Sequence, residues 1–145
     1  MFTDKIPLSE LEAEQINPVV LAFVGDAVYS LYVRERLVRS GEGKVSEFQK
    51  AAANVVSARG QSVFLDKLLP LLSEKEQAVF RRGKNAKKAT KSKNASNLEY
   101  SRSTGFEAVL GYLQLTGQES RIQELLSHCE ETLFHVVKAE KVFKP

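Results

Sequence analysis

The stretch that decides the fold is NPVVLAFVGDAVYSLYVRERLVRS, residues 17–40 of a 145-residue chain. Asn17 is a favourable N-cap and Pro18 suits the first helical position, so a helix begins here and continues to about Arg39. Residues 18–33 are apolar except for one aspartate, but a bilayer-spanning helix needs about 20 mostly apolar residues. We therefore predict a buried helix and no membrane segment. One apolar face of this helix consists of Val20, Phe23, Val24, Ala27, Val28 and Leu31, and the adjacent face consists of Val19, Ala22, Asp26, Tyr29 and Val33.

Hydrophobic spacing is helical along the rest of the chain too, which predicts an all-α, multi-helix fold. Further helices are expected over residues 46–58, 61–70, 73–82, 98–115 and 119–138. Ser46 is the expected cap of the first of these, and Gly60 is expected either to kink that helix or to separate it from the next. We predict that residues 1–16 form an N-terminal arm with one helical turn and that residues 83–97 form an exposed loop. The length fits one domain over residues 1–145.

The positive charge is concentrated in one segment, RRGKNAKKATKSK, at residues 81–93. The whole chain has 21 basic and 18 acidic residues, a net charge of +3, whereas this segment has seven basic residues and no acidic one. The remainder therefore has 14 basic residues against 18 acidic ones, a net charge of −4. Such a distribution predicts contact with a polyanion, and a solvated loop that aids solubility is the simpler alternative.

The single cysteine, Cys129, excludes a disulfide within the chain and zinc sites built from cysteine pairs. The first residues, MFTDKIPLSELEAEQ, lack the basic and apolar regions of a secretory signal. Because disulfides are rare in reducing compartments, we expect an intracellular, cytoplasmic protein.

Asp26 is the one charged residue in the apolar segment 18–33. Burying an unpaired carboxylate is costly, so Asp26 is expected to face a cation, a cluster of donors or water. Gly25 beside it allows the backbone of another element to approach closely. An aspartate that hydrogen-bonds the end of a neighbouring helix is an equally good explanation from this helix alone.

Glu107 occupies a similar place in the helix expected over 98–115, beside the small residues Ser103, Thr104 and Gly111. Taken alone, it is more simply a solvated helix residue. Two carboxylates on packed helices suit Mg²⁺ or Mn²⁺, and a basic segment in the same chain suggests metal-assisted phosphodiester hydrolysis. Paired carboxylates also serve as general acid and base in sugar hydrolysis, but that chemistry leaves the basic segment unexplained.

At these residues the chain resembles a known family. AFVGDAVYSLYVRERL (22–37) resembles the signature helix of the ribonuclease III family, with its Gly-Asp pair in an apolar helix. STGFEAVLGYL (103–113) resembles the second signature, in which a glutamate precedes a Leu-Gly step. VVSARGQS (55–62) and FRRGKNAK (80–87) resemble Mini-ribonuclease III, the short bacterial members that consist of the catalytic domain alone. The resemblance covers roughly residues 16–135 in matching order.

The resemblance implies an all-α homodimeric endonuclease that holds double-stranded RNA across the dimer. It implies Mg²⁺-dependent cleavage, with Mn²⁺ as a substitute, that leaves 5′-phosphate and 3′-hydroxyl ends. It further implies maturation of precursor 23S ribosomal RNA, and leaves open whether a ribosomal protein presents that substrate. Carried over by position, Asp26 and Glu107 are the catalytic carboxylates that bind the metal.

The chain departs from the typical family pattern at two positions, where Ala22 and Thr104 replace expected carboxylates. With less negative charge, we expect one well-held metal and a second ion recruited only with substrate. We expect no separate double-stranded-RNA-binding domain, so the basic segment has to supply more of the affinity for RNA. The candidate RNA-binding residues are Arg81, Arg82, Lys84, Asn85, Lys87, Lys88, Lys91 and Lys93.

Two other functions fit the same sequence. The missing carboxylates favour a non-catalytic RNA-binding or ribosome-assembly protein with a decayed nuclease site. The second alternative is an all-α interaction module that binds a partner through the helix over 18–39. A protein of this kind is expected to have no affinity for RNA. Arg59 and Gln61 are assigned no role, because they could contact RNA, brace the site or make ordinary surface contacts.

Overall fold

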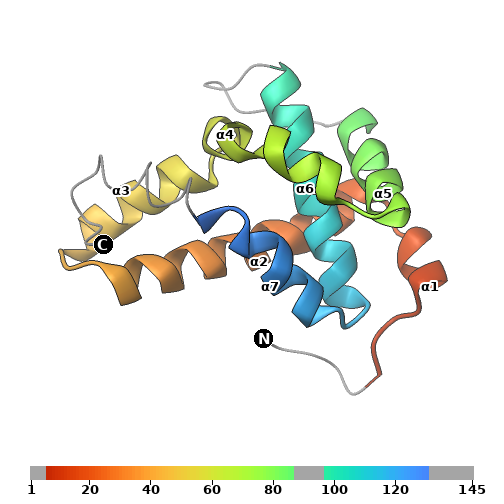
Figure 1. Ribbon diagram of the computed structural model, residues 1–145, viewed down its shortest axis with the longest axis horizontal. Helices are drawn as coiled ribbons and strands as arrows, with labels where there is room; N and C mark the ends of the chain where they lie inside the picture. The colour runs from red at the N-terminus through yellow and green to blue at the C-terminus, as the bar shows by residue number, and fades with distance from the viewer. Residues whose placement is uncertain (1–5, 87–96, 131–145) are drawn as a thin grey trace.

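The computed structural model describes residues 6–86 and 97–130, and all the secondary-structure elements in these ranges are helices (Figure 1). The prediction of an all-α fold is confirmed. No helix in this part of the chain is both long and apolar enough to cross a bilayer. The elements are α1 (Glu10–Glu14), α2 (Pro18–Ser40), α3 (Val45–Val56), α4 (Ala58–Leu68), a 3₁₀ turn (Leu69–Leu71), α5 (Glu74–Asn85), α6 (Asn97–Leu115) and α7 (Glu119–Ser127).

Helix α6 is the central element of the fold. It packs most extensively on α2, then on α5 and α4, and it also contacts α1 and α7. In Figure 1, α2 crosses α6 and continues away from it, so that the second half of α2 lies beside α3. The site that we describe below lies where α2 and α6 cross.

Two glycines bring the backbones of α2 and α6 into direct contact. A Cβ atom added to Gly25 would overlap the carbonyl oxygen of Glu107 and would lie 2.8 Å from the backbone nitrogen of Gly111. A Cβ atom added to Gly111 would overlap the carbonyl oxygen of Leu21. Since backbone atoms cannot move aside as a flexible side chain can, only glycine fits at both positions.

A second pair of glycines joins α5 to α6. A Cβ atom on Gly83 would lie 2.9 Å from the Cα atom of Gly105, and one on Gly105 would lie 2.7 Å from the Phe80 carbonyl oxygen. Gly83 is therefore buried and helical, and the prediction that a loop begins at residue 83 is wrong. Packing against α6 outweighs the low helix propensity of glycine and extends α5 to Asn85. Residues 87–96 of the predicted loop lie outside the described residues.

Three aromatic rings join the helices that carry the site. Tyr29 of α2, Phe64 of α4 and Phe106 of α6 form a buried cluster with ring centroids 5.4–6.0 Å apart. Edge-to-face pairs of this kind contribute about 0.5–1.5 kcal/mol beyond the burial of their surfaces. Each ring lies within one helical turn of a residue of the site, so the cluster fixes the three helices where their geometry matters.

The first apolar face noted on α2 is mostly not the face that the structure buries. Val28 is buried, but Val20, Phe23, Ala27 and Leu31 are exposed, and Phe23 is 79% exposed. The buried face instead consists of Leu21, Ala22, Gly25, Val28, Tyr29, Val33 and Leu37. Since α2 is apolar on more than one side, hydrophobic spacing could not select the face, and the close contact at Gly25 does.

The start of α3 also differs from the prediction. This helix begins at Val45, where the Glu47 carboxylate accepts a hydrogen bond from the Lys44 N–H at 3.2 Å, so Ser46 is not the cap. The helical turn expected within residues 1–16 is α1, which Ser9 caps by accepting a hydrogen bond from the Glu12 N–H. Helix α7 ends at Ser127 and residues 128–129 form a turn, so the prediction of one continuous helix over 119–138 is wrong. The part of that prediction beyond residue 130 lies outside the described residues.

The break between α3 and α4 lies at Ser57 and not at Gly60. The Ser57 hydroxyl accepts a hydrogen bond from the Gly60 N–H at 3.0 Å and so caps α4. A Cβ atom on Gly60 would overlap the backbone at the end of α3, where it meets the Asn54 carbonyl oxygen. The glycine therefore allows the first turn of α4 to lie directly against α3, which places the next residue, Gln61, toward α6.

Candidate active site

The two predicted carboxylates, Asp26 and Glu107, meet at the crossing of α2 and α6. Asp26 follows Gly25, and Gly25 contacts the backbone of Glu107 itself. The two carboxyl groups are close enough to repel each other and to share a hydrogen bond. The Asp26 side chain is exposed, which agrees with water as one of its three expected surroundings, whereas Glu107 is partly buried. One carboxylate thus faces solvent and the other lies beneath it.

The protonation of Glu107 is strongly perturbed. Burial raises the pKa of this carboxyl from its usual value of 4.5 to about 8, and the negative charge of Asp26 adds to the effect. A hydrogen bond with Asp26 acts in the same direction, and the one donated by Gln61 partly opposes it. At neutral pH the site therefore holds a proton that a divalent cation would displace, because a cation stabilises both carboxylates in their charged form.

A third residue, Gln61, completes the site from the first turn of α4. It is 1% exposed, and its side-chain N–H groups donate to Glu107 Oε2 and to the Val56 carbonyl oxygen, both at 3.0 Å. Its Oε1 atom is buried and has no hydrogen-bond partner among the described residues. An unpaired buried acceptor lowers the free energy of unfolding by about 1–3 kcal/mol, so burial of this amide destabilises the fold.

Sequence reasoning did not place Gln61 in the site. The only available signal was its position in VVSARGQS (55–62), which allowed bracing of the site as one of three roles. Its distance of 46 residues from Glu107 along the chain means that no helical spacing connects the two. Arg59, two residues earlier, is exposed on the same turn of α4.

The donors at this crossing fit a hard divalent cation. Carboxylate oxygens are what Mg²⁺ and Mn²⁺ prefer, and Mg²⁺ is often held by one or two carboxylates with water and phosphate as its other ligands. Among the described residues no group of three or more His, Cys, Asp or Glu is placed to hold a metal. Ala22 is buried, and the Thr104 hydroxyl donates to the Tyr100 carbonyl at 2.9 Å, so neither position adds an anionic ligand.

The described part of the basic segment lies at the end of α5. Arg81 and Asn85 are exposed and Lys84 is partly buried, while Lys87, Lys88, Lys91 and Lys93 lie outside the described residues. Gly83 contacts α6 at Gly105, which is two residues from Glu107, so the segment begins at the level of the carboxylates along α6.

Arg82, in the same segment, binds the protein's own backbone. Its guanidinium donates to the carbonyl oxygens of Glu14 at 2.7 Å and Ile16 at 3.3 Å, at the end of α1. These contacts hold α1 against α5. A phosphate would have to share this guanidinium with the two carbonyl groups.

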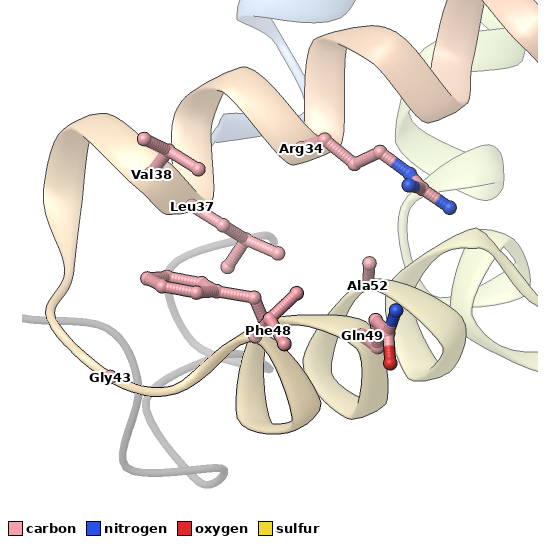
Figure 2. A pocket seen from close by; sticks show the side chains of 8 residues that line it. Arg34, Leu37, Val38, Gly43, Phe48, Gln49 and Ala52 are labelled. Carbon is pink, nitrogen blue, oxygen red and sulfur yellow. The ribbon is translucent and has the colours of Figure 1, made fainter.

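A pocket of about 400 Å³ lies elsewhere, between the second half of α2 and the start of α3 (Figure 2). Its walls are mainly apolar, with Leu37 facing Phe48 and Arg34 at one side, and Val38 also lines it. Neither Asp26 nor Glu107 lines it. The candidate catalytic carboxylates therefore lie at the helix crossing and not in this pocket.

Comparison with known proteins identifies the family of the chain. The Ribonuclease III domain family matches residues 19–118, a range that includes Asp26, Gln61 and Glu107. The chain belongs to the ribonuclease III family. Within this ribonuclease III family it is similar to the Mini-ribonuclease 3 of Symbiobacterium thermophilum, at 47% identity over 111 residues, which covers 77% of this chain and 85% of the relative.

Other ribonuclease III relatives extend the match. The Mini-ribonuclease 3 of Brevibacillus brevis is 44% identical over 124 residues, which covers 86% of this chain and 90% of that protein. A crystal structure of a protein from Fusobacterium nucleatum superposes with a TM-score of 0.72 at 26% identity, covering 81% of this chain and 93% of that one. The resemblance to Mini-ribonuclease III and the ribonuclease III-type fold are both confirmed.

Proposed function

We propose that the chain is a metal-dependent endoribonuclease that cleaves double-stranded RNA, with precursor 23S ribosomal RNA as its natural substrate. The observation that carries the proposal is the Asp26–Glu107 pair, brought together by the backbone contact at Gly25 and Gly111. Membership in the ribonuclease III family supports the ribonuclease activity and the double-stranded substrate. The metal, the product ends and the ribosomal substrate are parts of the proposal.

In this mechanism Asp26 and Glu107 would hold Mg²⁺, or Mn²⁺ in its place. Such an ion polarises a phosphate and lowers the pKa of an attacking water, which yields a 5′-phosphate and a 3′-hydroxyl. Asp26, exposed on α2, supplies the carboxylate on the substrate side. Glu107 loses its proton to become a ligand, and it keeps one oxygen on the Gln61 amide. Both carboxylates would serve to hold the ion, and the attack on the phosphorus would come from water and not from either side chain.

The proposal includes a homodimer that forms through the exposed stripe of α2, defined here as Val20, Phe23, Ala27 and Leu31. Apolar side chains repeated at three- and four-residue spacing on one exposed face are typical of a helix that packs on a partner. Two-fold symmetry would place α2 of one copy against α2 of the other. Because Asp26 lies between Phe23 and Ala27, the two sites would face one duplex across this interface.

The basic segment would position the RNA. A-form duplexes are recognised mainly through shape, phosphates and 2′-hydroxyl groups, which exposed lysine and arginine side chains can contact. Arg81 and Asn85 are exposed at the end of α5, and Lys84 lies between them. Lys87, Lys88, Lys91 and Lys93 belong to the proposed RNA-binding set through their sequence alone. Binding of this kind weakens steeply with salt.

The deciding experiment is a gel assay of long double-stranded RNA with wild-type protein and with Asp26→Asn. We expect cleavage that requires Mg²⁺, stops with a chelator and falls at least about 1000-fold in the variant, while RNA binding persists. Asp26→Asn keeps the shape of an exposed side chain, so a folded variant is expected. Full activity in this variant would remove Asp26 from the mechanism.

Other outcomes of the same assay identify the rival functions. Binding without cleavage in both Mg²⁺ and Mn²⁺ would favour a ribosome-assembly protein with a decayed nuclease site. Absence of RNA binding would favour an interaction module that acts through α2. Repeating the assay with precursor 23S RNA, bare and in ribosomal particles, tests the natural substrate and the need for a ribosomal protein.

A further inference from the structure

Gln61 connects three helices at the carboxylate pair. It lies in the first turn of α4, donates one N–H to the last residue of α3 and donates the other to Glu107 in α6. The orientation of its amide is fixed by these partners. A backbone carbonyl oxygen only accepts hydrogen bonds, so the NH₂ group has to face Val56, and the same nitrogen lies 3.0 Å from Glu107 Oε2.

The same local arrangement recurs at the start of α5, where it has no contact with the site. Gln77 lies four residues after the cap Ser73, as Gln61 lies four residues after Ser57. The Gln77 amide donates to the Leu72 carbonyl at 3.0 Å, the counterpart of the bond from Gln61 to Val56. Gln77 is only partly buried. The chain therefore contains two glutamines with one shared backbone bond, and Gln61 has the additional bond to Glu107.

The burial of Gln61 is not explained by packing. Its Oε1 atom is buried without a partner among the described residues, so an apolar side chain of similar volume would fill the space without that cost. The shared backbone bond does not require burial either, because Gln77 makes it in a partly exposed position. What distinguishes Gln61 is the hydrogen bond to the Glu107 carboxylate.

We propose that Gln61 is a positioning residue, which holds Glu107 Oε2 so that Oε1 is presented to a divalent cation shared with Asp26. This inference rests on the proposed function. Without the bond, the Glu107 side chain could rotate about its terminal torsion and lose the orientation that a ligand needs. Partners that orient a metal ligand in this way typically affect metal affinity or activity about 10- to 100-fold.

The test is a titration of the metal-free, full-length protein with Mn²⁺, followed by electron paramagnetic resonance, for wild type, Gln61→Met and Gln77→Met. Methionine keeps the side-chain volume and removes the donor. We expect Gln61→Met to weaken Mn²⁺ binding about 10- to 100-fold. Gln77→Met is the matched control, since it loses the same backbone bond, and we expect its Mn²⁺ affinity to equal that of wild type.

The outcomes separate this inference from the proposed function. No Mn²⁺ binding by the wild-type protein would overturn both. Wild-type binding that Gln61→Met leaves unchanged, or that Gln77→Met weakens equally, would overturn the role of Gln61 alone. On double-stranded RNA, Gln61→Met is expected to lower kcat and leave the KM for RNA unchanged, because Gln61 is buried beneath the carboxylates.

A measurement on the wild-type protein keeps the inference testable if Gln61→Met fails to fold. Side-chain amide signals in a ¹⁵N spectrum can be followed while Mg²⁺ is added. We expect the Gln61 NH₂ signals to shift, since their acceptor becomes a metal ligand, and the Gln77 signals to stay in place. A Gln61 signal that does not respond to a saturating concentration of Mg²⁺ would overturn the proposal.

Discussion

Helix α6 is crossed by two other helices through paired glycines, and the two crossings differ in what they hold. At the α2 crossing an added Cβ atom would overlap backbone carbonyl oxygens, whereas at the α5 crossing Gly83 would meet Gly105 Cα at 2.9 Å. The α2 crossing also holds Asp26 beside Glu107, where burial and the negative charge of Asp26 both disfavour ionisation of Glu107. The closer of the two backbone contacts thus coincides with a carboxyl group whose charged form is unfavourable.

The difference shows how the fold can keep an unfavourable site. Two neighbouring carboxylates would move apart if their helices were free to do so. Direct contact between the backbones at Gly25 and Gly111, with the aromatic cluster of Tyr29, Phe64 and Phe106 behind it, prevents this movement. The α5 crossing holds no such pair of carboxylates, and its less close backbone contact is sufficient for packing. The following predictions test this contrast, beginning with the largest expected effect.

Gly111→Ala is expected to disrupt the α2 crossing. The new methyl group would overlap the Leu21 carbonyl oxygen and lie 3.1 Å from the Gly25 nitrogen, so two backbones would have to separate. Overpacking of a core usually costs about 1–3 kcal/mol, and a clash with backbone should reach or exceed the upper value. Urea denaturation followed by circular dichroism measures this loss. A stability equal to wild type would show that α2 and α6 are not in direct contact.

The electrostatic part of the contrast predicts a pH-dependent stability in the absence of metal. The folded-state pKa of Glu107, about 8, lies above its usual value of 4.5, so the folded protein holds this proton more tightly than the unfolded chain. The stabilisation is complete below pH 4.5 and is lost as the pH rises through 8. At pH 9, Glu107→Gln should therefore be more stable than wild type, by a few kcal/mol at most.

Denaturation with chelator at pH 5, 7 and 9 checks this prediction. The expected result is a difference between wild type and Glu107→Gln that grows with pH. Saturating Mn²⁺ should remove most of the pH dependence in wild type, because the cation replaces the proton. Parallel pH profiles for the two proteins would contradict the raised pKa of Glu107.

Much of the fold could be predicted from the sequence because its signals are local. The Asn17-Pro18 start lies within one turn of the backbone groups that it satisfies and is found as predicted. The helix predicted from residue 73 likewise begins there, with Ser73 and Glu76 forming a capping box. The break at Ser57 was missed because a glycine is a strong local signal for a helix break. The structure shows that Gly60 instead lies within α4 and allows close contact with the end of α3. Local signals give the position of a helix better than they give its neighbours.

The candidate site was predicted in part for the same reason. Asp26 and Glu107 stand out because each interrupts an apolar pattern, and the motifs around them resemble known signatures. The exposure of Asp26 and of Phe23 could not be predicted, because α2 is apolar on two faces and only α6 selects one. Gln61 could not be predicted either, since its contact with Glu107 is made by packing of α4 against α6.

Gly83→Ala is expected to have the smallest effect and to separate the two crossings most clearly. Its methyl group would lie 2.9 Å from Gly105 Cα and 3.0 Å from Ala108 Cβ, a crowding that costs less than the overlap at Gly111. Alanine also favours a helix by about 1 kcal/mol over glycine, which offsets part of the clash. We expect a net loss of about 1 kcal/mol or less by urea denaturation, with unchanged Mn²⁺ affinity. Weaker Mn²⁺ binding in this variant would mean that the α5 crossing also holds the carboxylates in place, because a shift of α6 at Gly105 would then reach Glu107 two residues away.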